Sequence, residues 1–156
     1  MENRSCPGSD PAFARDRGTD YLPAMQTGQS GTIEIRVRYA ECDPMGVAHH
    51  SAYAPWFEMG RTELLRSSGG NYRDLEAAGV LLAVVKLSIR YKRPARYDDV
   101  LSLETSVANL GHVKIEHRYE LRRGDELLAT AETTLACIDR EGRARPLPAG
   151  LAPPAD

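Results

Sequence analysis

Reactive side chains gather between Tyr39 and Tyr53, in the stretch YAECDPMGVAHHSAY. The stretch contains a thiol at Cys42, a carboxylate at Asp43 and adjacent imidazoles at His49 and His50. Such groups could bind a metal ion, pair a thiolate nucleophile with a histidine base, or supply a carboxylate to general-base or nucleophilic catalysis. The remaining interpretation is an ordinary loop without chemistry.

A metal site is the least favoured of these interpretations. Adjacent histidines on a loop rarely point at one ion, and no second cluster of ligands appears elsewhere in the sequence. The three cysteines, Cys6, Cys42 and Cys137, are far apart and lack the close pairs of a zinc ribbon or a disulfide framework. We therefore expect no metal and no other cofactor, in a reducing, cytoplasmic setting.

Two hydrophobic periods flank the reactive stretch. Over 32–39, apolar residues at every second position alternate with charged ones, which predicts a half-buried strand. Helical spacing then predicts a helix that ends near 67–70, with the apolar stripe Tyr53, Trp56, Phe57, Gly60 and Leu64. Pro55 must lie in the first turn of this helix or bend it, because deeper inside it removes a backbone hydrogen bond.

Four further stretches alternate with period two. Their predicted apolar faces are Leu81, Ala83, Val85, Leu87, Ile89 and Tyr91; Leu101, Leu103, Thr105 and Val107; Val113, Ile115, His117, Tyr119 and Leu121; and Leu127, Ala129, Ala131, Thr133, Leu135 and Cys137. A short helix is predicted over 71–78, and Gly124-Asp125 suits a hairpin turn.

This order of elements predicts an α+β domain, in which one long helix covers the apolar face of a five-stranded antiparallel sheet. Five half-buried strands present more apolar surface than a single helix conceals. We therefore expect two subunits to pair.

Length and composition fit one domain. The chain has 156 residues, of which 42% are hydrophobic, and its net charge of -2 with mixed signs argues against sequence-independent nucleic-acid binding. We expect a disordered N-terminal extension over 1–31, a folded unit over 32–148 and a Pro-rich tail over 149–156. The extension has no apolar run long enough for a signal peptide or a membrane span.

The stretch RVRYAECDPMGVAHHSAY, from Arg36 to Tyr53, resembles the signature of the 4-hydroxybenzoyl-CoA thioesterase family of hotdog-fold proteins. The matching positions are Arg36, Val37, Cys42, Asp43, Gly46, Val47, His50 and Tyr53; Ala48 departs from the usual Val. The later stretches WFEMGRTELLR, YKRPARYDDVL and RPLP are similar to the YbgC-type acyl-CoA thioesterases of this family.

The resemblance implies a sheet wrapped around a long helix and the hydrolysis of an acyl-CoA thioester, with a short- or medium-chain or aromatic acyl group. It implies that Asp43 is the catalytic carboxylate, as general base or as nucleophile, and that the backbone N–H of His50 polarises the carbonyl. Gly46 suits the turn between them. A free Asp has a pKa of about 3.9, and a helix N-terminus favours its charged form, which leans toward the nucleophile. The family also implies a homodimer or a homotetramer.

Other reactive residues receive structural interpretations. The family accepts Thr in place of Cys42, so this thiol is expected to be a small semi-buried side chain. His49 is expected to be a loop residue, and His117 a core histidine with its hydrogen bonds satisfied. Glu58 and Glu63 on the helix are alternative catalytic carboxylates, of which only Glu58 remains as a second-rank candidate; an ion pair with Arg61 is the preferred interpretation of Glu58.

Substrate contacts are expected from two groups of residues. Lys86, Arg90 and Arg93 are candidates for the phosphates of CoA, and Tyr53, Trp56 and Phe57 for the acyl group. Two alternatives stay open. One is a hotdog module that binds an acyl-CoA, an acyl-carrier thioester or a partner protein without turnover, and the other is an enoyl-CoA hydratase or dehydratase on the same fold.

Overall fold

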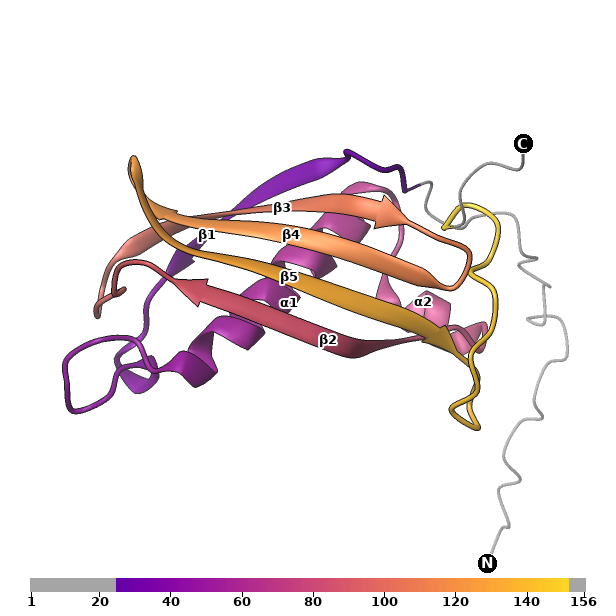
Figure 1. The fold of residues 1–156 in the computed structure, drawn as a ribbon, viewed down its shortest axis with the longest axis horizontal. Coiled ribbons are helices and arrows are strands. Elements are labelled where there is room, and N and C mark those ends of the chain that lie inside the picture. Colours follow the sequence, from indigo (N-terminus) through magenta and orange to yellow (C-terminus); the bar gives the residue numbers. More distant parts are fainter. Residues whose placement is uncertain (1–24, 152–156) are drawn as a thin grey trace, which may run out of the picture.

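The computed structural model describes residues 25–151 (Figure 1). The strands are β1 (Ser30–Arg36), β2 (Leu81–Tyr91), β3 (Val100–Leu110), β4 (Lys114–Arg123) and β5 (Glu126–Ile138), and the helices are α1 (His50–Ser67) and α2 (Tyr72–Ala77). Every strand pairs antiparallel with its neighbours, in the order β1-β3-β4-β5-β2. Helix α1 lies across one face of this sheet (Figure 1). The predicted α+β fold is therefore confirmed.

The ends of α1 follow from local chemistry. His49 caps the helix, because its Nδ1 accepts a hydrogen bond from the N–H of Ser51 at 3.2 Å. Pro55 is the sixth residue of α1, beyond the first turn, so the first of the two predicted alternatives is excluded. Its ring is exposed, and the Ser51 carbonyl that it leaves without a helical donor is on the solvent side, where water can hydrate it.

Strand β1 is shorter than predicted. It ends at Arg36, and a 3-10 turn occupies Tyr39–Glu41. Val37 instead pairs with the loop before β3, because its N–H donates to the Asp99 carbonyl at 2.9 Å and its carbonyl accepts from the Asp98 N–H at 3.0 Å. The chain has then turned away from the sheet, so Tyr39, predicted on the buried face, is 80% exposed.

A bulge in β2 changes which side chains face the helix. Val84 lies opposite Leu135 and Lys86 opposite Thr134, so Val85 is the extra residue. Leu87, Ile89 and Tyr91 face the helix side as predicted, whereas before the bulge that face is formed by Leu82 and Val84. The prediction for Leu81, Ala83 and Val85 is wrong because it assumed one unbroken alternation.

A second bulge affects β5. Leu121 of β4 lies opposite Ala129 and Arg122 opposite Leu127, which leaves Leu128 as the extra residue. Leu128 is fully buried, and Leu127 shares the outer face of the sheet with Arg122. The predicted inward position of Leu127 is therefore wrong. Elsewhere on β3, β4 and β5 the predicted inward positions are confirmed, whereas Val113 lies just before β4 and is only half-buried.

The folded unit is longer than the expected range of 32–148. Met25 is 5% exposed in the core, and β1 begins at Ser30, inside the expected extension. At the other end Leu151 is fully buried in the same cluster, inside the expected tail. Apolar side chains from both ends of the described chain are therefore buried together at one end of α1. The expected disorder of 1–24 and the tail over 152–156 lie outside the described residues.

Strand β2 forms an open edge of the sheet. It pairs with β5 only, and four of its apolar side chains are between 40% and 56% exposed: Val84, Val85, Leu87 and Tyr91. Neither α1 nor another described element covers them. Within the described part of the chain, no helix combines the length and hydropathy that a membrane span requires.

Helix α1 approaches β3 closely at Gly60. A Cβ atom added there would lie 2.3 Å from Thr105 Oγ1 and 2.9 Å from a methyl carbon of Leu103, both on fully buried residues. The glycine is therefore a spacing requirement between helix and sheet, not a weak point of the helix.

Gly60→Ala is expected to lower the free energy of unfolding by about 1–3 kcal/mol, because the added methyl group overpacks the interface. In an uncrowded helix the same change stabilises by about 1 kcal/mol, so the sign is the test. Denaturant unfolding measures it, with the exposed Met59→Ala on the same helix as the control. Equal or greater stability of Gly60→Ala would contradict the close approach.

Candidate active site

The segment Asp43–Gly46 forms a tight turn within a small hairpin. The Gly46 N–H donates to the Asp43 carbonyl at 2.9 Å, and the Asp43 N–H donates to the Val47 carbonyl at 3.0 Å. Pro44 suits the second position of a type I turn, and Gly46 supplies the left-handed conformation after it, with φ of +76°. The predicted turn at Gly46 is confirmed.

The Asp43 side chain takes part in this turn. Its Oδ1 accepts a hydrogen bond from the Met45 N–H at 2.9 Å, while its Oδ2 has no hydrogen-bond partner among the described residues. The residue is half-buried and lines a cleft. One carboxylate oxygen is thus fixed by the backbone, and the other is free to meet a ligand.

Helix α1 begins beside this turn. His50 is its first residue, and within residues 25–151 the His50 N–H donates no hydrogen bond to the protein. The hairpin docks on the loop before β3 through the Ala48 N–H, which donates to the Ala95 carbonyl at 2.7 Å. His49 is half-buried and outside the cleft, and its ring contacts that of His50 at 4.0 Å between centroids. A free helix N–H therefore lies in the same segment as Asp43.

The cleft has a volume of about 360 Å³. It is lined by the hairpin, the first turns of α1 and the end of β2 with the loop after it: Asp43, Met45, Val47, Ala48, His50, Tyr53, Tyr91, Lys92, Arg93 and Pro94. Tyr53 and Tyr91 meet edge to face at 4.9 Å between ring centroids, which makes an aromatic wall. Burial raises the pKa of both phenols, so they remain neutral at physiological pH.

Glu41 connects the hairpin to the helix, and the sequence analysis assigned it no role. Its Oε1 accepts from the Trp56 indole N–H at 3.0 Å and from Arg38 at 2.8 Å, and its Oε2 accepts from the Arg38 N–H at 2.8 Å. The Glu41 carbonyl also accepts from the His49 N–H at 2.7 Å. Burial alone would raise the pKa of Glu41, but the hydrogen bonds from Arg38 and Trp56 outweigh it and lower the pKa. A buried indole N–H needs a hydrogen-bond acceptor, so the predicted burial of Trp56 is the signal from which the role of Glu41 could have been found.

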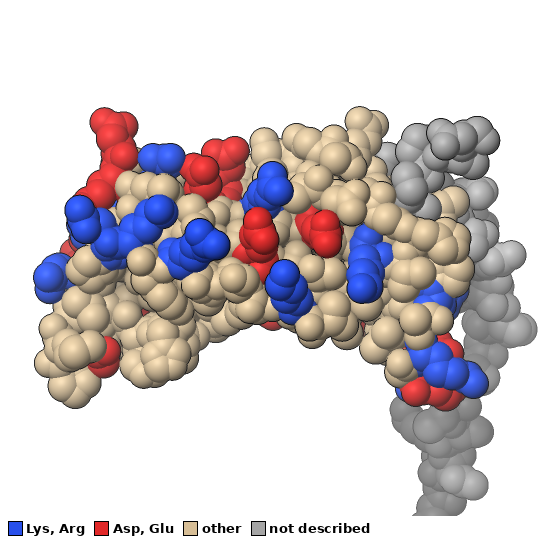
Figure 2. All heavy atoms as spheres, viewed as in Figure 1, with Lys and Arg blue, Asp and Glu red and all other residues tan. Residues whose placement is uncertain are grey.

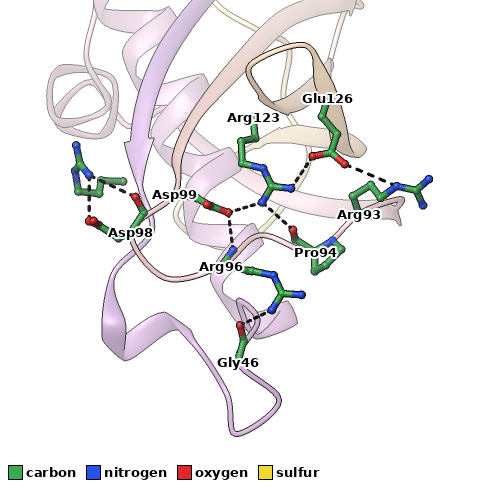
Figure 3. Close-up of polar contacts among 9 residues, drawn as sticks. Gly46, Arg93, Pro94, Arg96, Asp98, Asp99, Arg123 and Glu126 are labelled. Atoms are coloured by element: carbon green, nitrogen blue, oxygen red, sulfur yellow. Dashed lines mark hydrogen bonds and ion pairs between the residues drawn. The ribbon is translucent and has the colours of Figure 1, made fainter.

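A second network fixes the loop before β3 (Figure 3). The Asp99 carboxylate accepts from the Arg96 N–H at 2.8 Å and from the Arg123 guanidinium at 2.7 Å. Arg123 also donates to Glu126 at 2.6 Å, across the β4–β5 turn, and Arg96 donates to the Gly46 carbonyl at 3.3 Å. The loop, the β4–β5 turn and the hairpin are therefore joined at the mouth of the cleft.

The predicted substrate residues fall into three places. Tyr53 and Arg93 line the cleft with the catalytic candidates Asp43 and His50, and Arg93 also lies 3.8 Å from Glu126. Lys92 joins them at the rim. These residues come from segments far apart in the sequence, so the structure brings together the part of the predicted site that matters for chemistry.

Two other predicted pairs lie elsewhere. Trp56 and Phe57 are 1% and 0% exposed and belong to the core. Lys86 and Arg90 lie opposite Thr134 and Thr130 of β5, on the face of the sheet that points away from α1. That outer face carries basic and acidic side chains in mixture (Figure 2). The period-two pattern of β2 could not show which face borders the cleft.

Residues 37–154 match a family model described as the thioesterase-like superfamily. The chain belongs to this superfamily. The acyl-CoA thioesterase YbgC of Haemophilus influenzae is 35% identical over 117 residues, which cover 74% of this chain and 85% of the relative. The crystal structure of a DHNA-CoA thioesterase from Staphylococcus aureus superposes with a TM-score of 0.71 at 33% identity, covering 76% of this chain and 80% of that one.

A crystal structure of a 4-hydroxybenzoyl CoA thioesterase mutant in complex with 4-hydroxybenzoyl CoA shows the same fold. Its TM-score is 0.73 at 22% identity, and the match covers 79% of this chain and 96% of that one. The predicted hotdog fold is thereby confirmed, and the family model and the YbgC relative confirm the predicted membership of the thioesterases. The prediction was based on the signature from Arg36 to Tyr53. In the structure of this superfamily member, the signature includes the hairpin and the start of α1.

Glu41→Gln tests the connection between hairpin and helix. The lowered pKa of Glu41 means that its carboxylate contributes stability above the ordinary Glu pKa of 4.5, and that this contribution is lost as the pH falls through the lowered folded-state value. We expect Glu41→Gln to be less stable than the wild type at pH 7 and to lose less stability on acidification. Thermal unfolding between pH 7 and pH 3 measures both. Parallel pH profiles of the two proteins would contradict the role of Glu41.

Proposed function

We propose that this protein hydrolyses acyl-CoA thioesters to a carboxylic acid and free CoA, with Asp43 and the His50 backbone N–H as the reacting groups. The observation that carries the proposal is one cleft that contains a carboxylate with a free oxygen next to a helix start with a free N–H. The relatives named as acyl-CoA thioesterases support the same reaction.

The helix start supplies the donor for the oxyanion. When the thioester carbonyl points at the His50 N–H, negative charge that develops on its oxygen gains a hydrogen bond and the favourable end of the α1 dipole. The donor is part of the backbone and needs no reorganisation during the reaction. The His50 side chain is exposed at the cleft, where it is placed to orient water or substrate.

Asp43 completes the reaction by one of two routes. As a nucleophile, its free oxygen bonds to the thioester carbon, CoA leaves as a thiolate, and water then cleaves the mixed anhydride. As a general base, it takes a proton from a water whose oxygen attacks the same carbon, and the departing thiolate takes up a proton. The anchored Oδ1 and the free Oδ2 favour the nucleophile, because an oriented carboxylate needs no further movement to attack.

Asp43→Asn tests the proposal while keeping an acceptor for the Met45 N–H, so the turn is expected to survive. We expect kcat to fall by about a hundredfold or more, because the amide is neither a base nor a nucleophile. Thiol release from a panel of acyl-CoA esters measures it, with Glu63→Gln on the outer surface of α1 as the control.

Equal thiol release by the wild type and Asp43→Asn on every substrate would contradict the proposal. Acyl-CoA binding without any thiol release would favour the non-turnover module. A change in enoyl-CoA absorbance without thiol release would instead favour the hydratase or dehydratase.

We also propose which residues contact the substrate, based on the lining of the cleft. Lys92 and Arg93 at its rim are placed for the phosphates of CoA, and the wall of Tyr53 and Tyr91 for the acyl group. A volume of about 360 Å³ suits a short- or medium-chain or an aromatic acyl group. The predicted cytoplasmic setting stays a prediction.

Arg93→Ala is expected to raise KM for acyl-CoA severalfold with little change in kcat, because it removes binding energy that is equal in ground state and transition state. Lys86→Ala is expected to leave KM unchanged, because its side chain is on the outer face. Steady-state kinetics at two salt concentrations measure both. A larger effect of Lys86→Ala would place CoA on the outer face and contradict this assignment.

The open edge of β2 supports the predicted pairing of subunits. Among residues 25–151 no strand pairs with its outer side, and the exposed side chains of Val84, Leu87 and Tyr91 lie on the helix side of the sheet. A second copy that adds its own β2 there would extend the sheet and cover these side chains. We propose a homodimer built on this edge as the unit of a dimer or a tetramer.

A further inference from the structure

A polar band divides the interior into two apolar clusters. Thr105 of β3, His117 of β4 and Thr133 of β5 point toward the helix from neighbouring strands, and each is at most 3% exposed. Arg61 faces them from α1 and is only 8% exposed. Apolar clusters of the core lie on either side. A buried arginine in such a place requires an explanation, because desolvation of a guanidinium is costly.

The hydrogen bonds of the band are incomplete. The Tyr119 hydroxyl and Thr133 Oγ1 are paired at 2.8 Å. In contrast, Arg61 Nε, Thr105 Oγ1 and His117 Nδ1 are buried and have no partner among residues 25–151. The expected satisfied core histidine at position 117 is therefore wrong at Nδ1. Burial, and then the charge of Arg61, lowers the pKa of His117 to about 4, so Arg61 is the one charged group of this band at neutral pH.

Arg61 borders a separate cavity, which we call the Arg61 pocket. It has a volume of about 270 Å³ and is lined by Glu58, Arg61, Thr62, Tyr72, Glu76, Leu82 and Leu135. None of these residues lines the cleft that contains Asp43. Burial raises the pKa of Tyr72, although Arg61 opposes the rise, so the phenol keeps its proton and can donate it in a hydrogen bond. The pocket combines two donors with the apolar walls Leu82 and Leu135.

The ion pair with Glu58 leaves part of the hydrogen-bonding capacity of the Arg61 guanidinium unused. Glu58 accepts from Arg61 Nη2 at 3.3 Å, while the Glu58 side chain is 70% exposed. The Nε and Nη2 groups of a guanidinium form one edge that binds a carboxylate through two parallel hydrogen bonds. Here Nη2 has a long, solvent-exposed contact and Nε has none. An exposed single contact of this kind contributes little to stability.

We propose that the Arg61 pocket is a binding site for a small aliphatic carboxylate, distinct from the cleft. The carboxylate takes the Nε and Nη2 edge of Arg61 and the Tyr72 hydroxyl, and displaces the Glu58 side chain into solvent. Its alkyl chain lies against Leu82 and Leu135. Glu58 and Glu76 at the mouth repel a doubly charged phosphate more strongly than a single carboxylate, so the site selects a monoanion.

Hexanoate is the probe for the test, and isothermal titration calorimetry on the full chain is the measurement. We expect wild-type protein to bind hexanoate and not the neutral 1-hexanol. Arg61→Met should weaken binding by about tenfold or more, because both charge-assisted hydrogen bonds are lost. Glu58→Gln should tighten it, because a competing and repelling carboxylate is removed. Glu63→Gln, an exposed change on the same helix, is the matched control and should bind like the wild type.

The stability of the variants separates a ligand site from a structural role. Met fills the space of Arg61 without a buried charge, so the melting temperature of Arg61→Met without ligand should equal or exceed that of the wild type. Equal hexanoate affinity of Arg61→Met and wild type, or no binding to the wild type, would overturn the proposal. If Arg61→Met does not fold, Glu58→Gln decides alone, and an unchanged affinity overturns it. None of these results bears on thiol release at Asp43.

Discussion

The hydrogen bonds of the Glu41 carboxylate are the constraint on which the active-site geometry depends. They join three parts of the chain that approach from different directions: the segment after β1 at Arg38, the hairpin, and the buried face of α1 at Trp56. The side chain of Glu41 is 9% exposed; its bonds to Arg38 lie at the surface, while its bond to Trp56 is partly buried. Without them the hairpin that contains Asp43 would have only its backbone contacts to set its position against the helix.

The rest of the fold supports this constraint from outside. The network of Asp99, Arg123 and Glu126 fixes the loop before β3, and that loop accepts the hairpin at Ala95 (Figure 3). The sheet itself contributes no reacting group. Its role is to bury α1 so that the helix start, with a free N–H at His50, stays at the edge of the molecule. The proposed reacting groups thus lie on a short turn and a helix terminus that a rigid sheet supports, an arrangement that is common in enzymes.

The sequence predicted the elements and the turn of the hairpin, but not the relations between strands. Alternation located all five strands, and the DPMG turn and the start of α1 follow from local preferences of Pro, Gly and helix caps. The bulges at Val85 and Leu128 depend on how two strands pair, which no single strand encodes. Lys86 and Arg90 were expected near the substrate although they lie on the outer face, because the pattern of one strand does not show which face of the sheet borders the cleft.

Glu41 and Arg61 show a second limit of sequence reasoning. Both are charged residues, which are seldom buried, and the groups that surround each in the interior are distant in the sequence. Glu41 finds Trp56, fifteen positions away, and Arg61 faces a polar band built by three strands. The family signature led to the prediction of Asp43 and His50, which the structure places along one cleft. It offered nothing of that kind for the Arg61 pocket.

The most direct test of the central claim observes the His50 backbone N–H itself. An acyl-CoA analogue with a methylene group in place of the thioester sulfur keeps the carbonyl but is not hydrolysed, so it can be bound to isotope-labelled protein. If the carbonyl accepts a hydrogen bond from His50, the amide proton of this residue shifts strongly downfield on binding. The amide of Lys86, on the outer face, stays in place. An unmoved His50 amide in a saturated complex would contradict the account.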